Sequence, residues 1–354
     1  MAILYGFTNL KDVFAQRVDD VGVAVVNDAI DATIAEHNRQ LAALVGLFAT
    51  PTTEYKIRYR TPVAARLQPL DESGRARPIK LAGYYDVAFP LQEAGTAWGQ
   101  TYKASKKMTV QEANDILNTL LTADKRWMRD HILAALFTNA SWTFSDDQHG
   151  DLTVKGLANS DTDTYLVQTG ADAGATDTHY LAQANAIDAS NDPFPGIYDE
   201  LTEHPENSGE VVVLIPSNVK TAVQNLAGFY PTTDGNLNPG NATTTLRGSL
   251  GTPLPGMLLG YHEARVWIAE WKSLPSGYMI ATTTGGPRPL LMREEMEASL
   301  RGFNRVAERN DHPFYESQYL RIAGFGANNR IGALVQRIGS GSYAIPTNYT
   351  SPMA

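Results

Sequence analysis

The sequence predicts an α+β fold, in which long helices and antiparallel strands occupy separate stretches of the chain. The strands are clearest near the C-terminus, where residues 290–301 alternate apolar and polar side chains as a half-buried strand does. Two further strand-like stretches follow at 315–325 and 330–338, and we expect all three to form one long sheet. The helices are predicted by apolar stripes at helical spacing in two places of the N-terminal half.

Composition limits the class of protein. Of 354 residues, 43% are hydrophobic, which is enough for one large or two moderate cores. The formal net charge of -9 argues against general electrostatic binding of nucleic acid. The absence of cysteine excludes disulfides, thiolate metal sites and cysteine catalysis. The sequence shows no signal peptide and no run of about 18 apolar residues, so no membrane partner is expected.

The first 50 residues are expected to form an N-terminal arm whose main element is a helix over 19–48. Its apolar residues recur at helical spacing and are Val23, Val26, Ile30, Ile34, Leu41, Val45 and Phe48. Such a stripe fits an ordinary core or dimer helix, and it fits equally an extended arm that docks on a neighbouring subunit. Both interpretations stay open.

Residues 51–108 predict a long two-stranded hairpin with a basic tip. Strand-prone stretches at 56–59 and 84–89 flank a turn at 71–74. The segment carries ten Lys and Arg residues against five Asp and Glu residues. A hairpin of this length cannot bury itself, so we expect it to lie on an acidic surface of a sister subunit. A solvated hairpin within one domain is the alternative; nucleic-acid binding is less favoured because no aromatic residues interleave with the basic turn.

The strongest helix signal in the chain follows directly. Thr109 and Glu112 form a capping box, which marks a helix start. An apolar stripe then continues to about Thr138, and a helix of that length would span roughly 42 Å. A long helix directly after a long hairpin is an unusual pairing in a compact enzyme.

The central part of the chain predicts a small α/β sheet. Residues 211–215 are wholly apolar, as a central strand is, and Ser217 is expected to cap a helix over 218–226. A long loop at 228–256 and strands at 265–269 and 277–281 follow. The Gly-, Ser- and Pro-rich tail after Gly339 is expected to fray or to adhere to a neighbour.

No pattern in the sequence predicts catalysis. Hydrolase, phosphate-loop and zinc-protease motifs are absent, and the spacing of His179, His204 and the nearby acids does not match metal ligands. Glu295 and Glu297 fall on the polar face of the strand at 290–301, which favours a salt-bridge ladder with Arg293 and Arg301. Glu294 falls on the apolar face and therefore needs a partner. We accordingly assign no catalytic, cofactor-binding or metal-binding residue, and we expect no cofactor.

The order of these parts resembles the major capsid protein of tailed bacteriophages, whose Hong Kong 97-type fold is shared with encapsulin shells and herpesvirus capsid floors. The resemblance covers nearly the whole chain, and its most specific passages are residues 274–279, 289–294 and 321–330. It implies the following parts: an N-terminal arm at 1–50, an extended loop at 51–108, a peripheral domain with a spine helix at 109–194, an axial α/β domain at 195–285, and the second part of the peripheral domain with the C-terminal tail at 286–354.

The resemblance also implies a function. The chain would be a structural protein, not an enzyme, that assembles with itself into hexamers and pentamers of an icosahedral capsid around double-stranded DNA. Further partners would be a separate scaffolding protein, a portal protein and in some cases a decoration protein, with DNA contacted non-specifically, in a virion assembled in the bacterial cytoplasm. The expected intersubunit contact residues are Arg66, Arg75, Arg77, Lys80, Glu294, Glu295 and Glu297.

Two alternatives are kept beside this interpretation. Within the same fold, the chain could form an encapsulin-like compartment. In another class, it could be a soluble α+β enzyme that uses Glu294 or a histidine. Some members of the family join Lys to Asn between subunits, for which Lys56 or Lys80 and Asn328 or Asn329 would be the residues, but most relatives lack this cross-link and it is not expected here.

Overall fold

A computed structural model describes residues 14–60, 67, 69–70, 72–75, 83–168, 173–232, 254–263, 265–311 and 314–353. The chain divides into two compact units. Unit 1 consists of Met1–Ala43, Leu91–Asp130 and Arg293–Gly324. Unit 2 consists of Leu44–Pro90, His131–Met292 and Phe325–Ala354.

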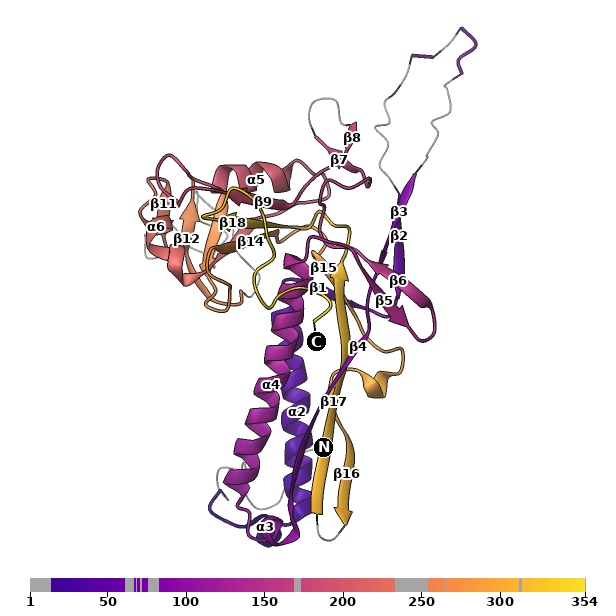
Figure 1. The fold of residues 1–354 in the computed structure, drawn as a ribbon, viewed down its shortest axis with the longest axis vertical. Helices are drawn as coiled ribbons and strands as arrows, with labels where there is room; N and C mark the ends of the chain where they lie inside the picture. The colour runs from indigo at the N-terminus through magenta and orange to yellow at the C-terminus, as the bar shows by residue number, and fades with distance from the viewer. Residues whose placement is uncertain are drawn as a thin grey trace. The chain divides into compact units, whose positions relative to one another are not determined.

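Unit 1 packs two long helices against three antiparallel strands of a five-stranded sheet (Figure 1). The helices are α2 (Val23–Val45) and α4 (Val110–Phe137), with the short helices α1 (Val18–Val21) and α3 (Tyr102–Ser105) beside them. The strands are β4 (Gln92–Thr101), β16 (Phe303–Asp311) and β17 (Phe314–Ala327), in the order β4-β17-β16. The C-terminal ends of α2, α4 and β17 belong to unit 2.

The core of unit 1 lies between these two layers. Ile34 of α2 and Leu117 and Leu121 of α4 are buried together with Phe303 and Tyr319 of the sheet. The predicted helical stripes therefore mark the faces that meet the strands, because burying one apolar stripe is what stabilises an amphipathic helix.

The predicted helix boundaries are close to those of the structure. The capping box is confirmed: the Thr109 hydroxyl accepts a hydrogen bond from the Glu112 backbone N–H at 3.2 Å, and the Glu112 carboxylate accepts one from the Thr109 backbone N–H at 2.8 Å. The helix predicted over 19–48 is divided at Gly22, whose φ of 102° is incompatible with a helix, and it ends at Val45.

The strand predicted over 290–301 is wrong beyond its first four residues. Strand β15 is Leu290–Arg293, and the 3₁₀ turn η3 (Ala298–Leu300) follows before the chain turns at Gly302 with φ 87°. The Arg301 guanidinium donates hydrogen bonds to the backbone carbonyls of Glu295 and Met296 at 2.7 and 2.8 Å. These bonds satisfy carbonyls that a strand would have paired, so the alternating pattern here belongs to an exposed loop.

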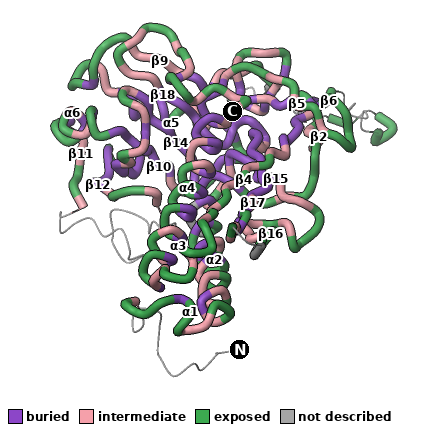
Figure 2. Tube along the Cα trace, turned by 60° about the horizontal axis from the view of Figure 1, so that its bottom comes forward, coloured by how far each residue is buried: buried purple, intermediate pink, exposed green. Residues whose placement is uncertain are grey.

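Unit 2 is built around a seven-stranded mixed sheet in the order β11-β12-β13-β10-β14-β18-β9. Its strands are β9 (Tyr180–Gln183), β10 (Val211–Ile215), β11 (Phe229–Pro231), β12 (Met257–His262), β13 (Val266–Glu270), β14 (Tyr278–Thr283) and β18 (Ala333–Ile338). Strand β10 pairs parallel with β13 and antiparallel with β14, and all five of its residues are buried. Figure 2 shows the buried residues gathered along these central strands. The strands predicted at 211–215, 265–269 and 277–281 are therefore confirmed.

Helix α5 (Phe194–Thr202) and helix α6 (Lys220–Gln224) contribute to the core of this sheet. Phe194, Ile197 and Leu201 of α5 and Val223 of α6 are buried against it. The predicted cap at Ser217 is wrong, because its hydroxyl donates to the Glu270 carboxylate at 2.7 Å instead of capping the helix. Ser217 lies in the 3₁₀ turn η2 (Ser217–Val219) that precedes α6.

The third closing strand does not join the same sheet as the other two. Strand β18 pairs antiparallel with β14 and parallel with β9, so it belongs to the seven-stranded sheet. Strands β15 and β17 share the other sheet, where β1 (Ala49–Thr52) is the neighbour of β15. The expectation of one long sheet is therefore wrong, since local strand propensity shows that a segment is a strand without showing which strand it pairs with.

Six other short strands in the described part of unit 2 form three antiparallel pairs. They pair β2 (Lys56–Arg60) with β3 (Tyr84–Ala88), β5 (Trp142–Asp146) with β6 (Gly150–Val154), and β7 (Tyr165–Val167) with β8 (Ala173–Ala175). The first pair confirms the predicted hairpin strands. Residues 92–101, which we expected within the same hairpin, instead form β4 and pair with β17 over their whole length.

The C-terminal tail packs on its own chain. The Tyr343 hydroxyl donates to the Phe137 carbonyl at 2.6 Å, the Tyr278 hydroxyl to the Ala344 carbonyl at 2.7 Å, and the Ser351 backbone N–H to the Thr138 hydroxyl at 2.8 Å. The expectation of a fraying tail is wrong because its tyrosines combine apolar contact with a hydroxyl that satisfies a carbonyl at the end of α4. Among the described residues, no helix has the length and apolar character needed to cross a membrane.

Candidate functional site

The residues predicted to contact other subunits fall into two groups. Arg66, Arg77 and Lys80 lie outside the described residues, whereas Arg75 is described and exposed. Glu294, Glu295 and Glu297 lie in the loop between β15 and η3. The two groups belong to different units of the chain.

The base of the basic hairpin has one charged and one buried face. On the charged face, the Arg58 guanidinium donates to both oxygens of the Asp86 carboxylate, at 2.7 and 2.9 Å, and Lys56 Nζ lies 2.8 Å from the same carboxylate. These hydrogen bonds hold the pKa of Asp86 well below its usual value, although partial burial acts in the opposite direction. The bond from Arg58 has the largest effect. Arg58 also lies over the Tyr84 ring, 3.9 Å from its centroid.

The opposite face holds the hairpin in unit 2. Tyr85 and Val87 of β3 are buried with Ala158, Leu291 and Ile331. The Tyr85 hydroxyl donates to the Asn329 carbonyl at 3.0 Å, and the Tyr59 hydroxyl donates to the Asn328 side-chain carbonyl. Burial raises the pKa of Tyr59 to about 12, so this hydroxyl keeps its proton at neutral pH.

Three of the four side chains considered for a Lys–Asn cross-link make polar contacts within the chain. The Asn328 amide nitrogen donates to the Arg288 carbonyl at 3.0 Å, and that of Asn329 donates to the Glu206 carboxylate at 2.9 Å. Lys56 is paired with Asp86. Lys80 lies outside the described residues.

The acidic loop differs from its predicted form. The Ser299 hydroxyl donates to the Glu297 carboxylate at 3.1 Å, and the Arg301 guanidinium binds backbone carbonyls. The predicted cross-strand ladder is wrong because the strand that would carry it ends at Arg293. Glu294 follows the end of β15 and is half-buried, so it does not occupy the apolar face of a strand. Met296 beside it is 76% exposed. The loop thus presents three carboxylates around one exposed apolar side chain.

A buried ionic network within unit 1 was not predicted. Asp124 of α4 accepts two hydrogen bonds from Arg321 of β17, and its Oδ2 lies 2.7 Å from His37 Nε2 of α2. All three side chains are buried. A signal was present in the sequence, because Asp124 lies between Leu120 and Met128 on the apolar stripe of the predicted helix, where an acid needs a partner.

A second buried cation organises the loops of unit 2. Arg330, 1% exposed, donates to the carbonyls of Gly156 and Leu157 at 2.8 and 3.0 Å and forms ion pairs with Asp161 and Asp163. Its backbone adopts a φ of 70°, which a non-glycine residue accepts only when its surroundings fix it. Several charge-assisted bonds of this kind offset the loss of hydration of a buried guanidinium.

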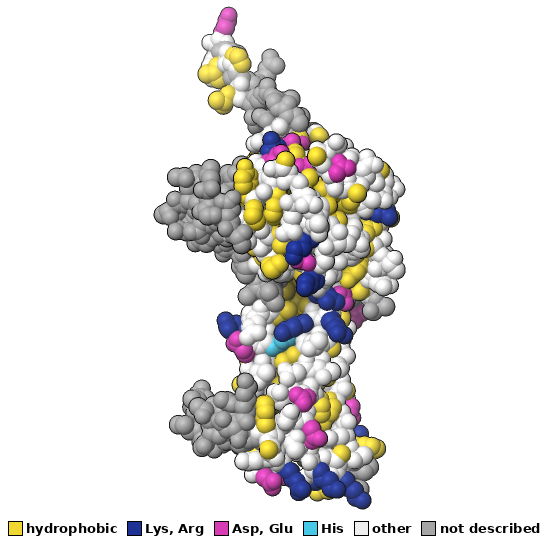
Figure 3. Space-filling view, turned by 90° about the vertical axis from the view of Figure 1, so that its left-hand side faces the viewer, with side chains coloured by type: hydrophobic (Ala, Val, Ile, Leu, Met, Phe, Trp, Pro, Cys, Tyr) yellow, Lys and Arg dark blue, Asp and Glu magenta, His cyan; other side chains and the backbone are white. Residues whose placement is uncertain are grey.

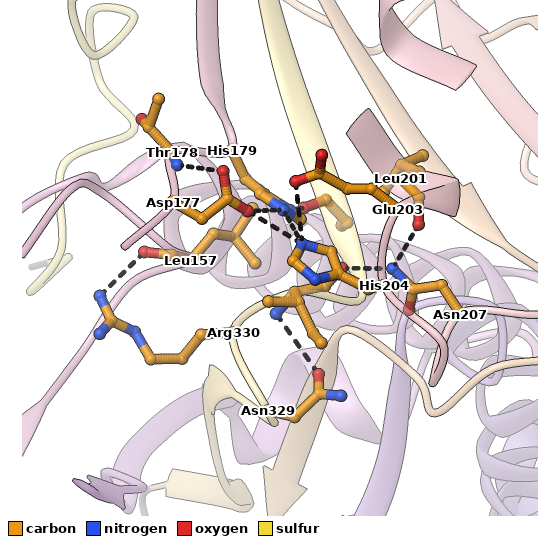
Figure 4. A network of polar contacts seen from close by, with 12 residues as sticks. Leu157, Asp177, Thr178, His179, Leu201, Glu203, His204, Asn207, Asn329 and Arg330 are labelled. Atoms are coloured by element: carbon orange, nitrogen blue, oxygen red, sulfur yellow. Dashed lines mark hydrogen bonds and ion pairs between the residues drawn. The ribbon is translucent and has the colours of Figure 1, made fainter. Parts of the chain in front are cut away.

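Two histidines and one aspartate meet at a single point in unit 2 (Figure 4). Asp177 Oδ2 lies 2.8 Å from His179 Nε2 and 2.9 Å from His204 Nε2, and the two Nε2 atoms lie 3.1 Å apart. Asp177 and His179 precede β9, and His204 follows α5. We name Asp177, His179 and His204 the histidine cluster.

Two further carboxylates adjoin the histidine cluster. Glu203 lies 3.9 Å from His204 Nε2, and Glu200, one turn earlier on α5, has a carboxylate close to those of Asp177 and Glu203. Burial and the Asp177 charge raise the pKa of Glu200 to about 7. Burial would raise the pKa of Asp177, but its bonds to the two histidines hold it well below its usual value.

Sequence spacing gave no sign of the histidine cluster. Its members come together because β9 and the chain after α5 both lie beside β18, and pairing between distant strands is not visible in local spacing. His179 and His204 lie 25 residues apart and form no short metal-ligand motif.

The surface of unit 1 carries a group of lysines around α3. Lys103, Lys106 and Lys107 are exposed, and Lys106 Nζ lies 2.9 Å from the Asp19 carboxylate. Figure 3 shows Lys and Arg side chains gathered at the lower end of the view, where Figure 1 places α3. This group is local, since Asp and Glu outnumber Lys and Arg in the chain as a whole.

Comparison with known proteins identifies the fold. No family model matches the sequence, and no curated protein matches it. A solved chain from Mycobacterium phage Patience is 19% identical and aligns over 99% of this chain and 97% of its own length, with a TM-score of 0.71. Two further solved chains are similar. One, from the capsid of the native GTA particle, is 14% identical and aligns over 85% of this chain and 91% of its own, with a TM-score of 0.49. The other, from the mature capsid of bacteriophage PhiM1, is 10% identical and aligns over 82% of this chain and 84% of its own, with a TM-score of 0.49. The chain therefore has the α+β fold of tailed-phage major capsid proteins, the Hong Kong 97-type fold.

Proposed function

We propose that this chain is a structural protein that assembles with copies of itself into hexamers and pentamers of an icosahedral shell around the double-stranded DNA of a tailed phage. The observation that carries this proposal is the fold, which matches the Patience chain over nearly the full length of both proteins. A match of this extent leaves no part of the chain for a separate catalytic domain, which supports a role without enzymatic activity.

Exposed apolar side chains on the hairpin support contact with a neighbour. Between β2 and β3, Leu67 is fully exposed and Leu70 is also exposed, and Tyr84 at the start of β3 is exposed as well. Large apolar side chains that are exposed in this way favour a partner that covers them. The charged face at Arg58 and Asp86 would then lie beside that apolar contact.

The acidic loop offers chemistry complementary to the hairpin. We infer that Arg66, Arg75, Arg77 and Lys80 of one subunit lie against Glu294, Glu295 and Glu297 of its neighbour, with Met296 providing apolar contact. Such pairs at the rim of an interface mainly select the correct partner and orientation, while burial of apolar area supplies most of the affinity. Contacts repeated around a closed ring would make assembly cooperative.

The remaining roles follow from the same proposal. Residues 1–50 would be the arm, 51–108 the extended loop, 109–194 and 286–354 the peripheral domain, and 195–285 the axial domain. A separate scaffolding protein and a portal protein would act during assembly in the host cytoplasm, and a decoration protein would be an optional addition to the virion. The net charge of -9 suits a shell that encloses DNA without binding it tightly.

A charge-reversal experiment tests the proposed contact. The triple variant Arg66→Glu, Arg75→Glu and Arg77→Glu should stop shell formation, as seen by electron microscopy and sedimentation, while circular dichroism stays as in the wild type. The matched control replaces the same three residues with Lys and should still form shells. Adding Glu294→Lys, Glu295→Lys and Glu297→Lys to the first variant should restore assembly. Normal shells from the first variant alone would contradict the proposed contact.

A further inference from the structure

The hydrogen bonds of the histidine cluster fix the state of both rings. His179 Nδ1 lies 2.6 Å from the Ala333 carbonyl oxygen, and His204 Nδ1 lies 2.9 Å from the Leu166 carbonyl oxygen. A carbonyl oxygen can only accept, so each Nδ1 carries a hydrogen. In the neutral ring, each Nε2 then presents a lone pair, and both lone pairs point toward the Asp177 carboxylate (Figure 4).

Three electron-rich atoms this close together require a positive species between them. Oδ2 of Asp177 and the two Nε2 atoms lie within 3.1 Å of one another, and the side chains of both histidines are 0% exposed and that of Asp177 is 8% exposed. One proton on either ring leaves the other lone pair facing the carboxylate. Two protons place two imidazolium N–H groups against each other. A single cation bound to all three atoms satisfies every lone pair at once.

The donor set and its supports match a divalent transition metal. Imidazole nitrogen with carboxylate oxygen is a ligand combination of Zn²⁺, and metal-binding histidines characteristically donate their other N–H to a backbone carbonyl, as both rings do here. Tetrahedral zinc at about 2.0–2.1 Å places its ligand atoms roughly 3.3 Å apart. The rings need to separate by only a few tenths of an ångström.

Glu203 completes the arrangement on the side that faces solvent. The Glu203 side chain is 27% exposed, and its carboxylate lies 3.9 Å from His204 Nε2, so it can approach as a fourth ligand. Its exposure provides an entry path for the ion. We propose that Asp177, His179 and His204, with Glu203 as the fourth ligand, form a structural Zn²⁺ site in unit 2. The ion would join the segment before β9 to the end of α5, and the carbonyl partners would extend this connection to β7 and β18.

This site would stabilise the folded unit without taking part in a reaction. A ligand that binds the folded chain in preference to the unfolded chain raises the melting temperature with its concentration. The proposal concerns the single chain and does not depend on whether the chain forms shells.

Metal content and thermal stability test the proposal together. The purified full-length chain is treated with EDTA, dialysed, and then incubated with ZnCl₂ or, as a control for a cation that prefers oxygen-only sites, with MgCl₂. After removal of free metal, we expect one Zn²⁺ per chain by mass spectrometry of the metal, and a melting temperature that rises with Zn²⁺ but not with Mg²⁺. Zinc content well below one per chain together with an unchanged melting temperature would overturn the site.

Variants locate the ion and separate binding from folding. His204→Gln and Asp177→Asn should abolish Zn²⁺ uptake, whereas His149→Gln, which alters a partly exposed histidine paired with Asp146 in the same unit, should retain it. Glu203→Gln changes a more exposed ligand and should weaken binding by at least about tenfold while the chain stays folded. If the two buried variants unfold, Co²⁺ added to the wild type should give the visible absorption of tetrahedral nitrogen and oxygen ligation, and its absence would contradict the proposal.

Discussion

The Arg321 guanidinium donates two hydrogen bonds of 2.6 Å to the two oxygens of the Asp124 carboxylate. Arg321 lies on β17 and Asp124 on α4, and His37 of α2 approaches the same carboxylate at 2.7 Å. One buried anion thus links both long helices of unit 1 to its sheet. The ion pair joins two residues that lie 197 positions apart in the sequence, and no local pattern reveals such a contact.

Breaking this pair should destabilise unit 1 strongly. Arg321→Met leaves the Asp124 charge buried beside only a histidine, and we expect a loss of about 3–5 kcal/mol in the free energy of unfolding, measured by urea denaturation. Arg39→Met removes an exposed ion pair with Glu36 on the same helix as His37 and should have no measurable effect. The double variant Asp124→Leu with Arg321→Met should recover part of the loss, because no unpaired charge remains.

The same carboxylate predicts how stability depends on acid pH. Burial raises the pKa of Asp124, but hydrogen bonds from His37 and Arg321 outweigh it and hold the pKa below its ordinary value. A lowered folded-state pKa contributes stability that is complete above the unfolded value of about 3.9 and is lost as the pH falls toward the folded value. In melts measured from about pH 6 down to about pH 2, the melting temperature should fall more steeply below about pH 4 for the wild type than for Asp124→Asn. Parallel curves would contradict this assignment.

The capping box should contribute at the start of α4. Thr109→Ala removes the acceptor for the Glu112 backbone N–H, and we expect a loss of about 1 kcal/mol in stability. Hydrogen exchange should quicken in the first turn of the helix. Thr122→Ala, which removes a hydroxyl bonded to the Asn118 carbonyl within the same helix, is the control and should leave that first turn unchanged.

The tail should stabilise unit 2 through Tyr343. Its hydroxyl donates to the Phe137 carbonyl, and its ring packs beside those of Tyr180 and Tyr278. Tyr343→Phe should cost about 1 kcal/mol by loss of the hydrogen bond, and Tyr343→Ala more, since the ring contacts are lost as well. Ser342→Ala, at an exposed position beside Tyr343, is the control. Equal melting temperatures for Tyr343→Ala and the wild type would show that the tail is not held.

Much of the fold could be predicted because its elements carry strong local signals. Helix α4 has both a capping box and a long stripe, and β10 is five apolar residues between turns. The order of parts then led to the capsid fold that the comparison with solved structures identifies. The hairpin strands β2 and β3 were predicted because β-prone residues surround a clear turn.

The errors concern partners that are distant in sequence. Strand β18 carries apolar, β-prone residues that suit pairing with β17 as well as with β14, so its sheet could not be predicted. The alternation after Arg293 failed because Arg301 binds backbone carbonyls and turns the segment into a loop. The histidine cluster requires β9 and the end of α5 to meet beside β18, a contact that only the tertiary structure supplies.

Whether this chain assembles into shells can be tested directly by electron microscopy of the purified full-length chain, with and without a co-expressed scaffolding protein. We expect closed shells, or the capsomers and tubes that form when closure fails. A uniform 38.6 kDa species that never assembles under either condition would contradict it.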